Sequence, residues 1–198
     1  KQHAYGKDGL GLGYIPNYLK DYETRNEQDQ AASQDYADLL KARQGGVIYT
    51  CGNGGSAAEA LHLVEEVIGC YGNRARPARA AVCLNADPTT LTCIANEFGY
   101  ENVFSRQLEA LARPKDVLIV LSTSGESRNI INALQVARDT GTQTIGLLGR
   151  GGTAAELCDT GLLVPVDQTA AIQEAHLAMV HCLCAAIEHH TPIPGDHA

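Results

Sequence analysis

Residues 46–56 read GVIYTCGNGGS, a short apolar run that leads directly into a glycine-rich loop. Residues 117–127, VLIVLSTSGES, repeat this arrangement with serine and threonine in place of most of the glycines. Continuous runs of Val, Ile and Leu are typical of strands that are covered on both faces, as in a parallel sheet with helices on each side. Each stretch therefore predicts a buried strand followed by a loop that opens a helix.

Outward from these two stretches, strand-like and helix-like segments alternate along the chain. The expected strands are 47–51, 79–84, 117–122, 144–148 and 161–166, and the expected helices are about 56–68, 91–96, 103–112, 129–140, 153–158 and 170–189. This alternation predicts an α/β fold with a doubly wound parallel sheet of five strands. Ligands of such sheets bind beyond the carboxyl ends of the strands, where the strand order reverses. The loops at 52–56 and 122–127 are therefore the expected binding site.

A chain of 198 residues suits a single domain. We expect a loose tail at 1–12, an N-terminal helical region at 13–44 and an α/β core at 45–190. The helical region has apolar residues and tyrosines at helical spacing and ends in two glycines, which favour a helix stop. Because a detached helix of that length is only marginally stable, this region is expected to pack against a neighbouring subunit.

Composition limits the classes of partner. The formal net charge of −8 argues against a nucleic-acid partner, because phosphate neutralisation needs clustered Lys and Arg. No apolar stretch approaches the ~20 residues that a membrane helix needs, and the polar, glycine-rich N-terminus does not read as a signal peptide. The seven cysteines are odd in number and form no C-x-x-C, so they are expected to be reduced. We therefore expect a cytoplasmic protein without a membrane partner.

The two loops have the composition of an anion site. Hydroxyl groups and free backbone N–H groups at a helix N-terminus bind phosphate without any lysine, so an acidic protein can hold a phosphate locally. Alternatively, Ser122, Ser124 and Ser127 only cap the helix, since serine is a preferred N-cap residue. Residues 52–57 also fit G-x-G-x-x-A, but a dinucleotide site expects an acidic residue ~20 positions later, and residues 67–86 contain none. A nicotinamide site is therefore not favoured.

Two of the expected helices carry groups that can transfer a proton. His62 and Glu66 are four residues apart and share one face of the helix after the first loop. Gln173 and His181 are eight residues apart on the last helix and point within about a quarter turn of each other. We hypothesise that the four side chains converge beside the phosphate loops as a proton-transfer and metal site. The alternative is that each is an ordinary residue of an amphipathic helix.

Several motifs, in this order, resemble the sedoheptulose 7-phosphate isomerases, also called phosphoheptose isomerases, of the SIS (sugar isomerase) superfamily. The similarity covers roughly residues 45–188 and includes CGNGGSAAEALHLVEE, LTCIANEFGYENVFSRQLEAL, STSGES and AAIQEAHLAMVHCL. The resemblance implies an SIS-type three-layer α/β sandwich with a five-stranded parallel sheet and N-terminal helices, assembled as a homotetramer with sites at subunit interfaces. It also implies the interconversion of sedoheptulose 7-phosphate and D-glycero-D-manno-heptose 7-phosphate in heptose biosynthesis.

The same resemblance implies roles for individual residues. Glu66 matches the family's general base, and His181 matches its general acid. The residues that match the ligands of a zinc ion, one per subunit, are His62, Glu66, Gln173 and His181. Those that match substrate and phosphate contacts are Asn53, Gly54, Gly55, Ser56, Glu97, Ser122, Thr123, Ser124, Ser127 and Gln173.

The expected chemistry suits these residue types. Moving a carbonyl from C2 to C1 requires removal of a proton beside the carbonyl, stabilisation of an enediolate and return of the proton to the neighbouring carbon. A carboxylate can take the proton, and a metal or a protonated imidazole can stabilise the enediolate. Because a zinc-bound carboxylate is a poorer base, Glu66 can fill both roles only through ligand exchange or a metal-bound water.

Three positions depart from the usual pattern of the family. Cys70 stands where arginine is typical, Glu97 where aspartate is typical, and Ala170 where aspartate is typical. Loss of a charged partner in a sugar site is costly when the opposite group is left unpaired. Two alternatives therefore stay open: an isomerase of a different sugar phosphate, and a non-catalytic SIS protein that binds a sugar phosphate or another protein. Retention of all four proton-transfer and metal residues argues against the second alternative.

Overall fold

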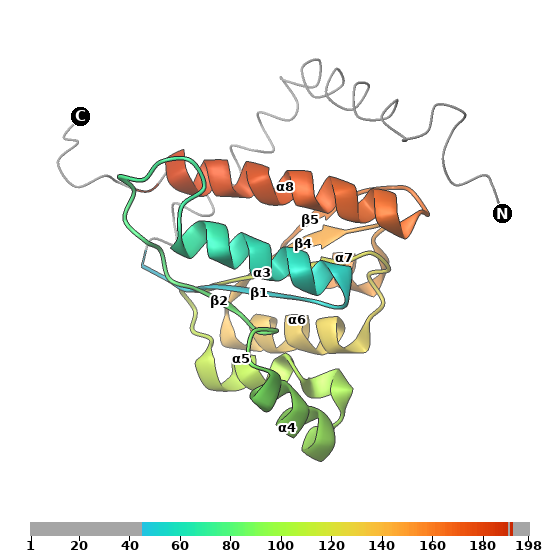
Figure 1. Ribbon diagram of the computed structural model, residues 1–198. Coiled ribbons are helices and arrows are strands. Elements are labelled where there is room, and N and C mark those ends of the chain that lie inside the picture. Colours follow the sequence, from blue (N-terminus) through green and yellow to red (C-terminus); the bar gives the residue numbers. More distant parts are fainter. Residues whose placement is uncertain (1–44, 190, 192–198) are drawn as a thin grey trace.

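The computed structural model describes residues 45–189 and residue 191, in which strands and helices alternate (Figure 1). The strands are β1 (Ile48–Gly52), β2 (Ala81–Cys83), β3 (Val117–Ser122), β4 (Gln143–Leu148) and β5 (Thr160–Leu163). The helices are α3 (Gly55–Ile68), α4 (Pro88–Phe98), α5 (Ser105–Leu111), α6 (Arg128–Thr140), α7 (Gly152–Leu157) and α8 (Thr169–His189), with a 3-10 helix η1 (Tyr100–Asn102). The expected tail at 1–12, the expected helical region at 13–44, and residues 190 and 192–198 lie outside the described part.

The five strands form one parallel sheet in the order β2-β1-β3-β4-β5. The order reverses between β1 and β3, which are paired along their whole length up to Gly52 opposite Leu121. The expectation of a doubly wound, five-stranded parallel sheet is confirmed. Since the carboxyl ends of β1 and β3 are neighbours, the two loops that follow them leave the sheet side by side.

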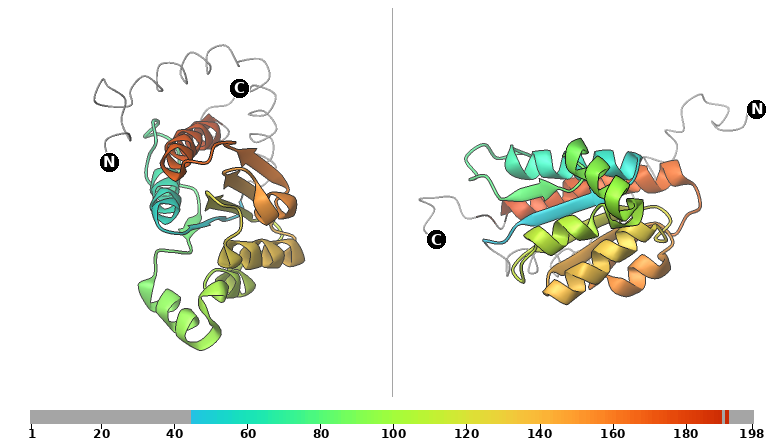
Figure 2. Two further views of the ribbon diagram at one scale, coloured as in Figure 1. Left: turned by 90° about the vertical axis from the view of Figure 1, so that its right-hand side faces the viewer. Right: turned by 90° about the horizontal axis from the view of Figure 1, so that it is seen from below.

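Helices cover both faces of the sheet and give three layers (Figure 2). One core cluster joins α3 and α8 to Val117, Ile119 and Leu121 of β3. The other joins α4, α5, α6 and α7 to Leu118 and Val120 of the same strand. Successive side chains of a strand point to opposite faces, so a strand between two helical layers must be apolar at every position. This packing is the physical reason for the uninterrupted VLIVL run.

Helix α8 corrects one expectation from the sequence. With 21 residues it is long and apolar enough to cross a membrane by length and composition, although no apolar stretch was expected to reach that length. In the fold, however, its residues Val180, Leu183 and Ile187 are buried in the same core cluster as β3. Core packing therefore accounts for the apolar residues on one side of α8, although only a third of its apolar window is buried and other residues, such as Leu177, are exposed.

Helix α4 begins earlier than the apolar pattern at 91–96 indicated. Asp87 is its N-cap, and the Asp87 carboxylate accepts a hydrogen bond from the backbone N–H of Thr89 at 2.8 Å. Pro88 occupies the first helical position, where its missing N–H has no consequence. The sequence Asp-Pro therefore starts this helix three residues before its first apolar side chain.

Two glycines have nearly the same left-handed backbone but different surroundings. Gly125, in the loop after β3, has φ of 67°, and a Cβ there would lie 1.8 Å from the carbonyl oxygen of Gly151. Gly141, which ends α6, has φ of 70°, and its nearest neighbour would be Pro114 Cβ at 3.7 Å. Of these two glycines, Gly125 alone combines a φ that is unfavourable for other residue types with a close approach of another backbone segment.

This pair gives a matched test of the second loop. We expect Gly125→Ala to lower the free energy of unfolding by about 3 kcal/mol or more, because the loop must move away from Gly151. Gly141→Ala should cost only about 1 kcal/mol, the penalty of a left-handed residue with room for its Cβ. Urea unfolding of both variants checks the difference, and equal losses at the two positions would contradict it.

Candidate active site

A pair of side-chain amides joins the two loops at the carboxyl edge of the sheet. Asn53, directly after β1, donates from Nδ2 to Asn129 Oδ1 at 2.9 Å, and Asn129 donates from Nδ2 to Asn53 Oδ1 at 2.8 Å. Asn129 is buried in the first turn of α6. The reciprocal bonds therefore fix the N-terminal ends of α3 and α6 relative to each other.

Tyr100 of η1 completes this amide pair from outside the two loops. Its hydroxyl donates to Asn53 Oδ1 at 2.9 Å. The side-chain oxygen of Asn53, Oδ1, thus accepts two hydrogen bonds from within the protein, which use both of its lone pairs. Asn53 was predicted to contact substrate, and one of the two N–H groups on its Nδ2 remains available for a ligand.

The second loop presents its hydroxyl groups around a tight turn. Ser122 is buried and its Oγ accepts a hydrogen bond from the N–H of Gly125 at 3.1 Å. Ser124 Oγ accepts from the N–H of Glu126 at 3.2 Å, while Ser127 is the N-cap of α6 without a side-chain capping bond. A hydroxyl that accepts from a backbone N–H can still donate its own proton. These serines can therefore shape the loop and bind an anion at the same time.

The first loop leaves the start of α3 open. Its N-cap residue, Gly54, is exposed and has no side chain to accept from the first turn of this 14-residue helix. Ser56 is buried beneath the loop, and its N–H bonds the carbonyl of Asn53 at 3.1 Å. The partial positive charge of a helix N-terminus favours an anion at this position.

Gln173 of α8 lies directly against the first loop. A Cβ at Gly55 would be 2.3 Å from Gln173 Nε2, so the amide of Gln173 occupies the space that any larger residue at position 55 would need. A side chain at position 55 would displace the amide of Gln173, and the contact shows that the beginnings of α3 and α8 lie together.

Three of the predicted proton-transfer side chains meet between α3 and α8. His62 Nε2 lies 3.1 Å from His181 Nε2 and 3.7 Å from Glu66 Oε1, and one ligand atom from each residue falls within 4.8 Å of the others. The opposite ring nitrogen of His62, Nδ1, lies 3.1 Å from Glu65 Oε2, which favours Nδ1 as the donor and leaves Nε2 free for the cluster. We call His62, Glu66 and His181 the seam cluster.

The seam cluster fits a zinc ion by donor chemistry and by spacing. Two imidazoles and a carboxylate are a known ligand set for catalytic zinc. Adjacent ligand atoms of a tetrahedral site with bonds of 2.0–2.1 Å lie about 3.3 Å apart, close to the separations from His62 Nε2. All three residues are half-buried, so a substrate can reach the remaining coordination positions.

Gln173 and Glu97 lie apart from the seam cluster. Eight residues of helix correspond to a rise of about 12 Å, which places Gln173 at the phosphate loop rather than beside His181 in this chain. Glu97 is exposed on α4, across the sheet from α3 and α8, and its carboxylate accepts from Asn96 Nδ2 at 2.7 Å. Four residues were predicted to converge, and a single chain brings three of them together: His62, Glu66 and His181.

A half-buried acid, Glu59, and a buried imidazole, His176, lie between the phosphate loop and the seam cluster, and sequence reasoning missed both. Glu59 Oε2 on α3 is 3.9 Å from His176 Nδ1 on α8, and within the described residues neither this oxygen nor either ring nitrogen has a hydrogen-bond partner. Burial raises the pKa of Glu59 to about 7 and lowers the pKa of His176. The signal available in sequence was the helical spacing of Glu59, His62 and Glu66 on one face of α3.

Known proteins with the same architecture identify the family. The SIS domain family matches residues 13–149. A phosphoheptose isomerase from Aliarcobacter butzleri is 47% identical over 178 residues, which cover 89% of this chain and 93% of the relative. The solved phosphoheptose isomerase from Francisella tularensis superposes with a TM-score of 0.76 at 32% identity, over 91% of this chain and 99% of that one. The corresponding enzyme from Neisseria gonorrhoeae gives 0.75 at 35% identity, over 90% and 98%.

The chain belongs to the SIS domain family, and within that family to the phosphoheptose isomerases. The resemblance found in the sequence motifs is thereby confirmed, as is the SIS-type α/β fold with a five-stranded parallel sheet.

The Glu59–His176 pair predicts a pH-dependent stability that Glu59→Gln should remove. Because burial raises the folded pKa of Glu59 from its ordinary 4.5 to about 7, its contribution to stability is full below about pH 4.5 and is lost as the pH rises to about 7. His176 has the opposite sign: burial lowers its pKa from 6.5, so its contribution is full above 6.5 and is lost as the pH falls.

Urea unfolding between pH 4 and pH 8 separates the two groups. The free energy of unfolding of wild type minus that of Glu59→Gln should decline as the pH rises from about 4.5 to about 7. The same difference for His176→Gln should change in the opposite direction below about pH 6.5. A Glu59 difference that stays constant over this range would contradict the assignment.

Proposed function

We propose that the protein is a ketose-aldose isomerase that interconverts sedoheptulose 7-phosphate and D-glycero-D-manno-heptose 7-phosphate. The observation that carries this proposal is that the first phosphate loop and the seam cluster lie at different heights along the same helix, α3, with the second loop held beside the first by the Asn53–Asn129 amides. From Gly55 to His62, α3 rises by about 10 Å. An extended seven-carbon sugar can bridge this span with its terminal phosphate on the loops and its carbonyl end at the seam cluster.

The phosphate is held by hydroxyl and backbone donors rather than by lysine. Its oxygens accept from the hydroxyls of Ser122, Thr123, Ser124 and Ser127 and from the N–H groups that open α3 and α6. The one remaining N–H of Asn53 adds a further donor. Local donors of this kind suit a chain whose net charge of −8 disfavours anions at long range.

In the isomerisation, Glu66 acts as the base and His181 as the acid. Glu66 removes a proton from C1 of the ketose, the C1–C2 double bond forms, and His181 donates a proton to the oxygen at C2. Return of the proton to C2 and loss of the proton from the oxygen at C1 give the aldehyde. The half-buried position of the carboxylate limits access of water to the enediolate.

A zinc ion fits the donor set of His62, Glu66 and His181. When bound, it polarises the carbonyl and stabilises negative charge on the substrate oxygens. A carboxylate that held the ion would be a weaker base than a free one, so the roles of Glu66 as ligand and as base would compete. Gln173, predicted as a fourth ligand, lies at the phosphate loop of its own chain and could reach a seam cluster only from another subunit.

Substitution at the acid and base tests the reaction. We expect Glu66→Gln and His181→Gln each to lower kcat by about 10²- to 10⁴-fold, because each removes a proton-transfer group. Incubation with sedoheptulose 7-phosphate in D2O, followed by NMR, reports aldose formation and deuterium at C1 of the ketose or C2 of the aldose. Addition of a chelator and then of zinc tests the metal. Variants as fast as wild type would exclude this mechanism.

The three departures from the family motif favour one alternative, an isomerase with a different sugar phosphate. Cys70, Glu97 and Ala170 change polar side chains that the resemblance implies for the sugar site. A panel of ketose phosphates in the same assay, run on wild type and on Cys70→Arg, separates the two substrates. A non-catalytic binding role would show neither aldose nor label with any substrate.

We also propose that the active form is a cytoplasmic homotetramer with its sites at subunit interfaces. Exposed apolar side chains lie along α3 and α8 beside the seam cluster, at Leu61, Ile68 and Leu177. A partner seated there would bury this face and could bring its own Gln173 toward the cluster.

Light scattering of the full chain checks the assembly. We expect a mass of about four times the 21.0 kDa of one chain, because large exposed apolar side chains on a soluble protein favour association. A single species of 21.0 kDa at the enzyme concentration used in the assay would contradict the tetramer.

A further inference from the structure

The loop between α3 and β2, residues 69–80, is anchored to both helices of the seam. Glu188, near the end of α8, accepts hydrogen bonds from the backbone N–H groups of Gly72 at 3.0 Å and Asn73 at 3.1 Å. The loop therefore runs back beside α8 instead of passing straight to the sheet edge, as Figure 1 shows.

The side chain of Arg76 adds buried hydrogen bonds to this contact between the loop and Glu188. Its guanidinium is 1% exposed and its Nε donates to Glu188 Oε1 at 3.3 Å. Its two Nη atoms donate to the last carbonyls of α3, those of Glu66 and Val67, each at 3.0 Å. These carbonyls have no partner within the helix, so Arg76 supplies their hydrogen bonds and ties the loop to the turn that carries Glu66.

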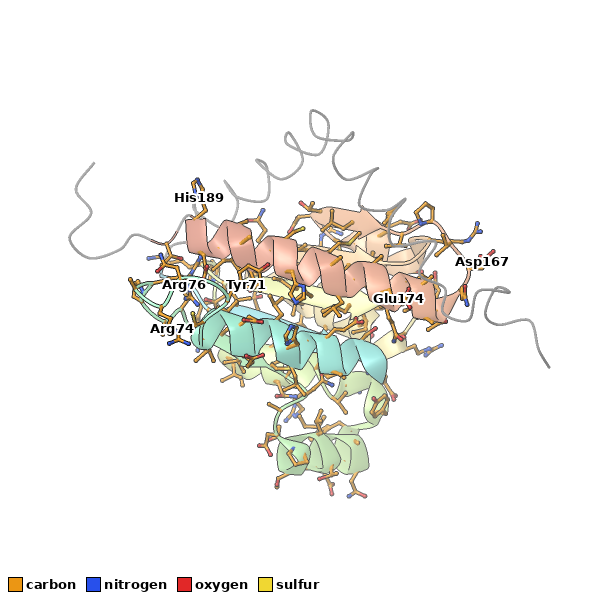
Figure 3. The ribbon with its side chains drawn as sticks, turned by 45° about the horizontal axis from the view of Figure 1, so that its top comes forward. Tyr71, Arg74, Arg76, Asp167, Glu174 and His189 are labelled. Atoms are coloured by element: carbon orange, nitrogen blue, oxygen red, sulfur yellow. The ribbon has the colours of Figure 1, made fainter. Side chains whose placement is uncertain are left out.

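The anchored loop places an aromatic ring on the seam cluster. The ring of Tyr71 lies 5.8 Å from that of His181, with an angle of 30° between the planes. On its other side, His181 meets the ring of His62 edge to face at 5.3 Å and 75°. Figure 3 shows Tyr71 at the seam between α3 and α8, whereas Arg74 lies at the outer end of the loop.

We infer that Tyr71 is a positioning residue for the isomerisation: its ring holds the imidazole of His181 in the orientation that faces His62 and Glu66. This inference rests on the proposed function of His181. An imidazole on a half-buried helix face has several rotamers, and contact with two rings restricts that choice. Because proton transfer depends on the direction of Nε2, loss of the ring should affect the chemical step more than substrate binding.

The ring, rather than the hydroxyl, carries this role. Tyr71 is 40% exposed, and its ring lies 5.8 Å from the ring of His181 with a tilt of 30°. Tyr71→Phe keeps this ring contact and Tyr71→Leu removes it. Phe98→Leu is the matched control, because Phe98, the last residue of α4, is a similarly exposed aromatic residue, 46% accessible, whose ring lies against Arg106 of α5.

The test measures kcat and KM for sedoheptulose 7-phosphate together with the imidazole proton resonances of His181, assigned by their disappearance in His181→Gln. We expect Tyr71→Leu to lower kcat about tenfold or more with little change in KM, and to shift the His181 resonances as the ring current is lost. Tyr71→Phe and Phe98→Leu should stay within about twofold of wild type in kcat and leave these resonances near their original positions.

Three results would overturn the inference, two of them kinetic and one spectroscopic. If Tyr71→Leu keeps the wild-type kcat, the ring has no positioning role, whatever the resonances do. If Tyr71→Phe loses as much activity as Tyr71→Leu, the hydroxyl and not the ring contact is responsible. If wild type fails to isomerise any sugar phosphate, the proposed function fails; unchanged His181 resonances in Tyr71→Leu would then separately refute the ring contact.

Discussion

The hydrogen-bonded amides of Asn53 and Asn129 are the contact on which the candidate site depends. At the point where the strand order reverses, α3 and α6 leave neighbouring strands for opposite faces of the sheet. Nothing in the sheet itself fixes the separation of their N-terminal ends. The two reciprocal bonds do so, with the hydroxyl of Tyr100 as a third member, because a part-buried polar network of this kind favours one arrangement of its side chains. Two helix N-termini held in this way form one anion site.

The seam between α3 and α8 relates this anion site to the proton-transfer groups. Both helices run in the same direction along one face of the sheet, so contacts recur along them at a nearly constant offset. Gln173 meets Gly55 at the loop, and two turns further on His181 meets His62. A sugar phosphate that lies along the seam therefore meets phosphate donors at one end and an acid and a base at the other. The rigid spacing of two helices, rather than a flexible loop, sets that distance.

The pair of half-buried Glu59 and buried His176 lies at the middle of the same seam and has an energetic cost. Polar atoms without hydrogen-bond partners in a protein interior are destabilising, and proteins retain them most often near functional sites. The cost is reduced because burial favours the neutral forms of both groups, as the directions of their pKa shifts indicate. The seam thus carries ionisable residues along its length while the opposite sides of α3 and α8 supply the apolar core.

The sequence by itself determined the parallel sheet, the approximate position of every described strand and the two loops, because uninterrupted apolar runs such as 117–121 are typical of strands between two helical layers. It also determined that His62 and Glu66 share a face, since helical periodicity is local. Only the tertiary structure decided which groups meet across elements. It separated Gln173 from His181 along α8 and placed Glu97 across the sheet from the seam cluster. It also brought Tyr71 to His181, because the ion pair between buried Arg76 and Glu188 anchors the loop that carries Tyr71. Such contacts depend on how helices and loops pack together, which local periodicity does not encode.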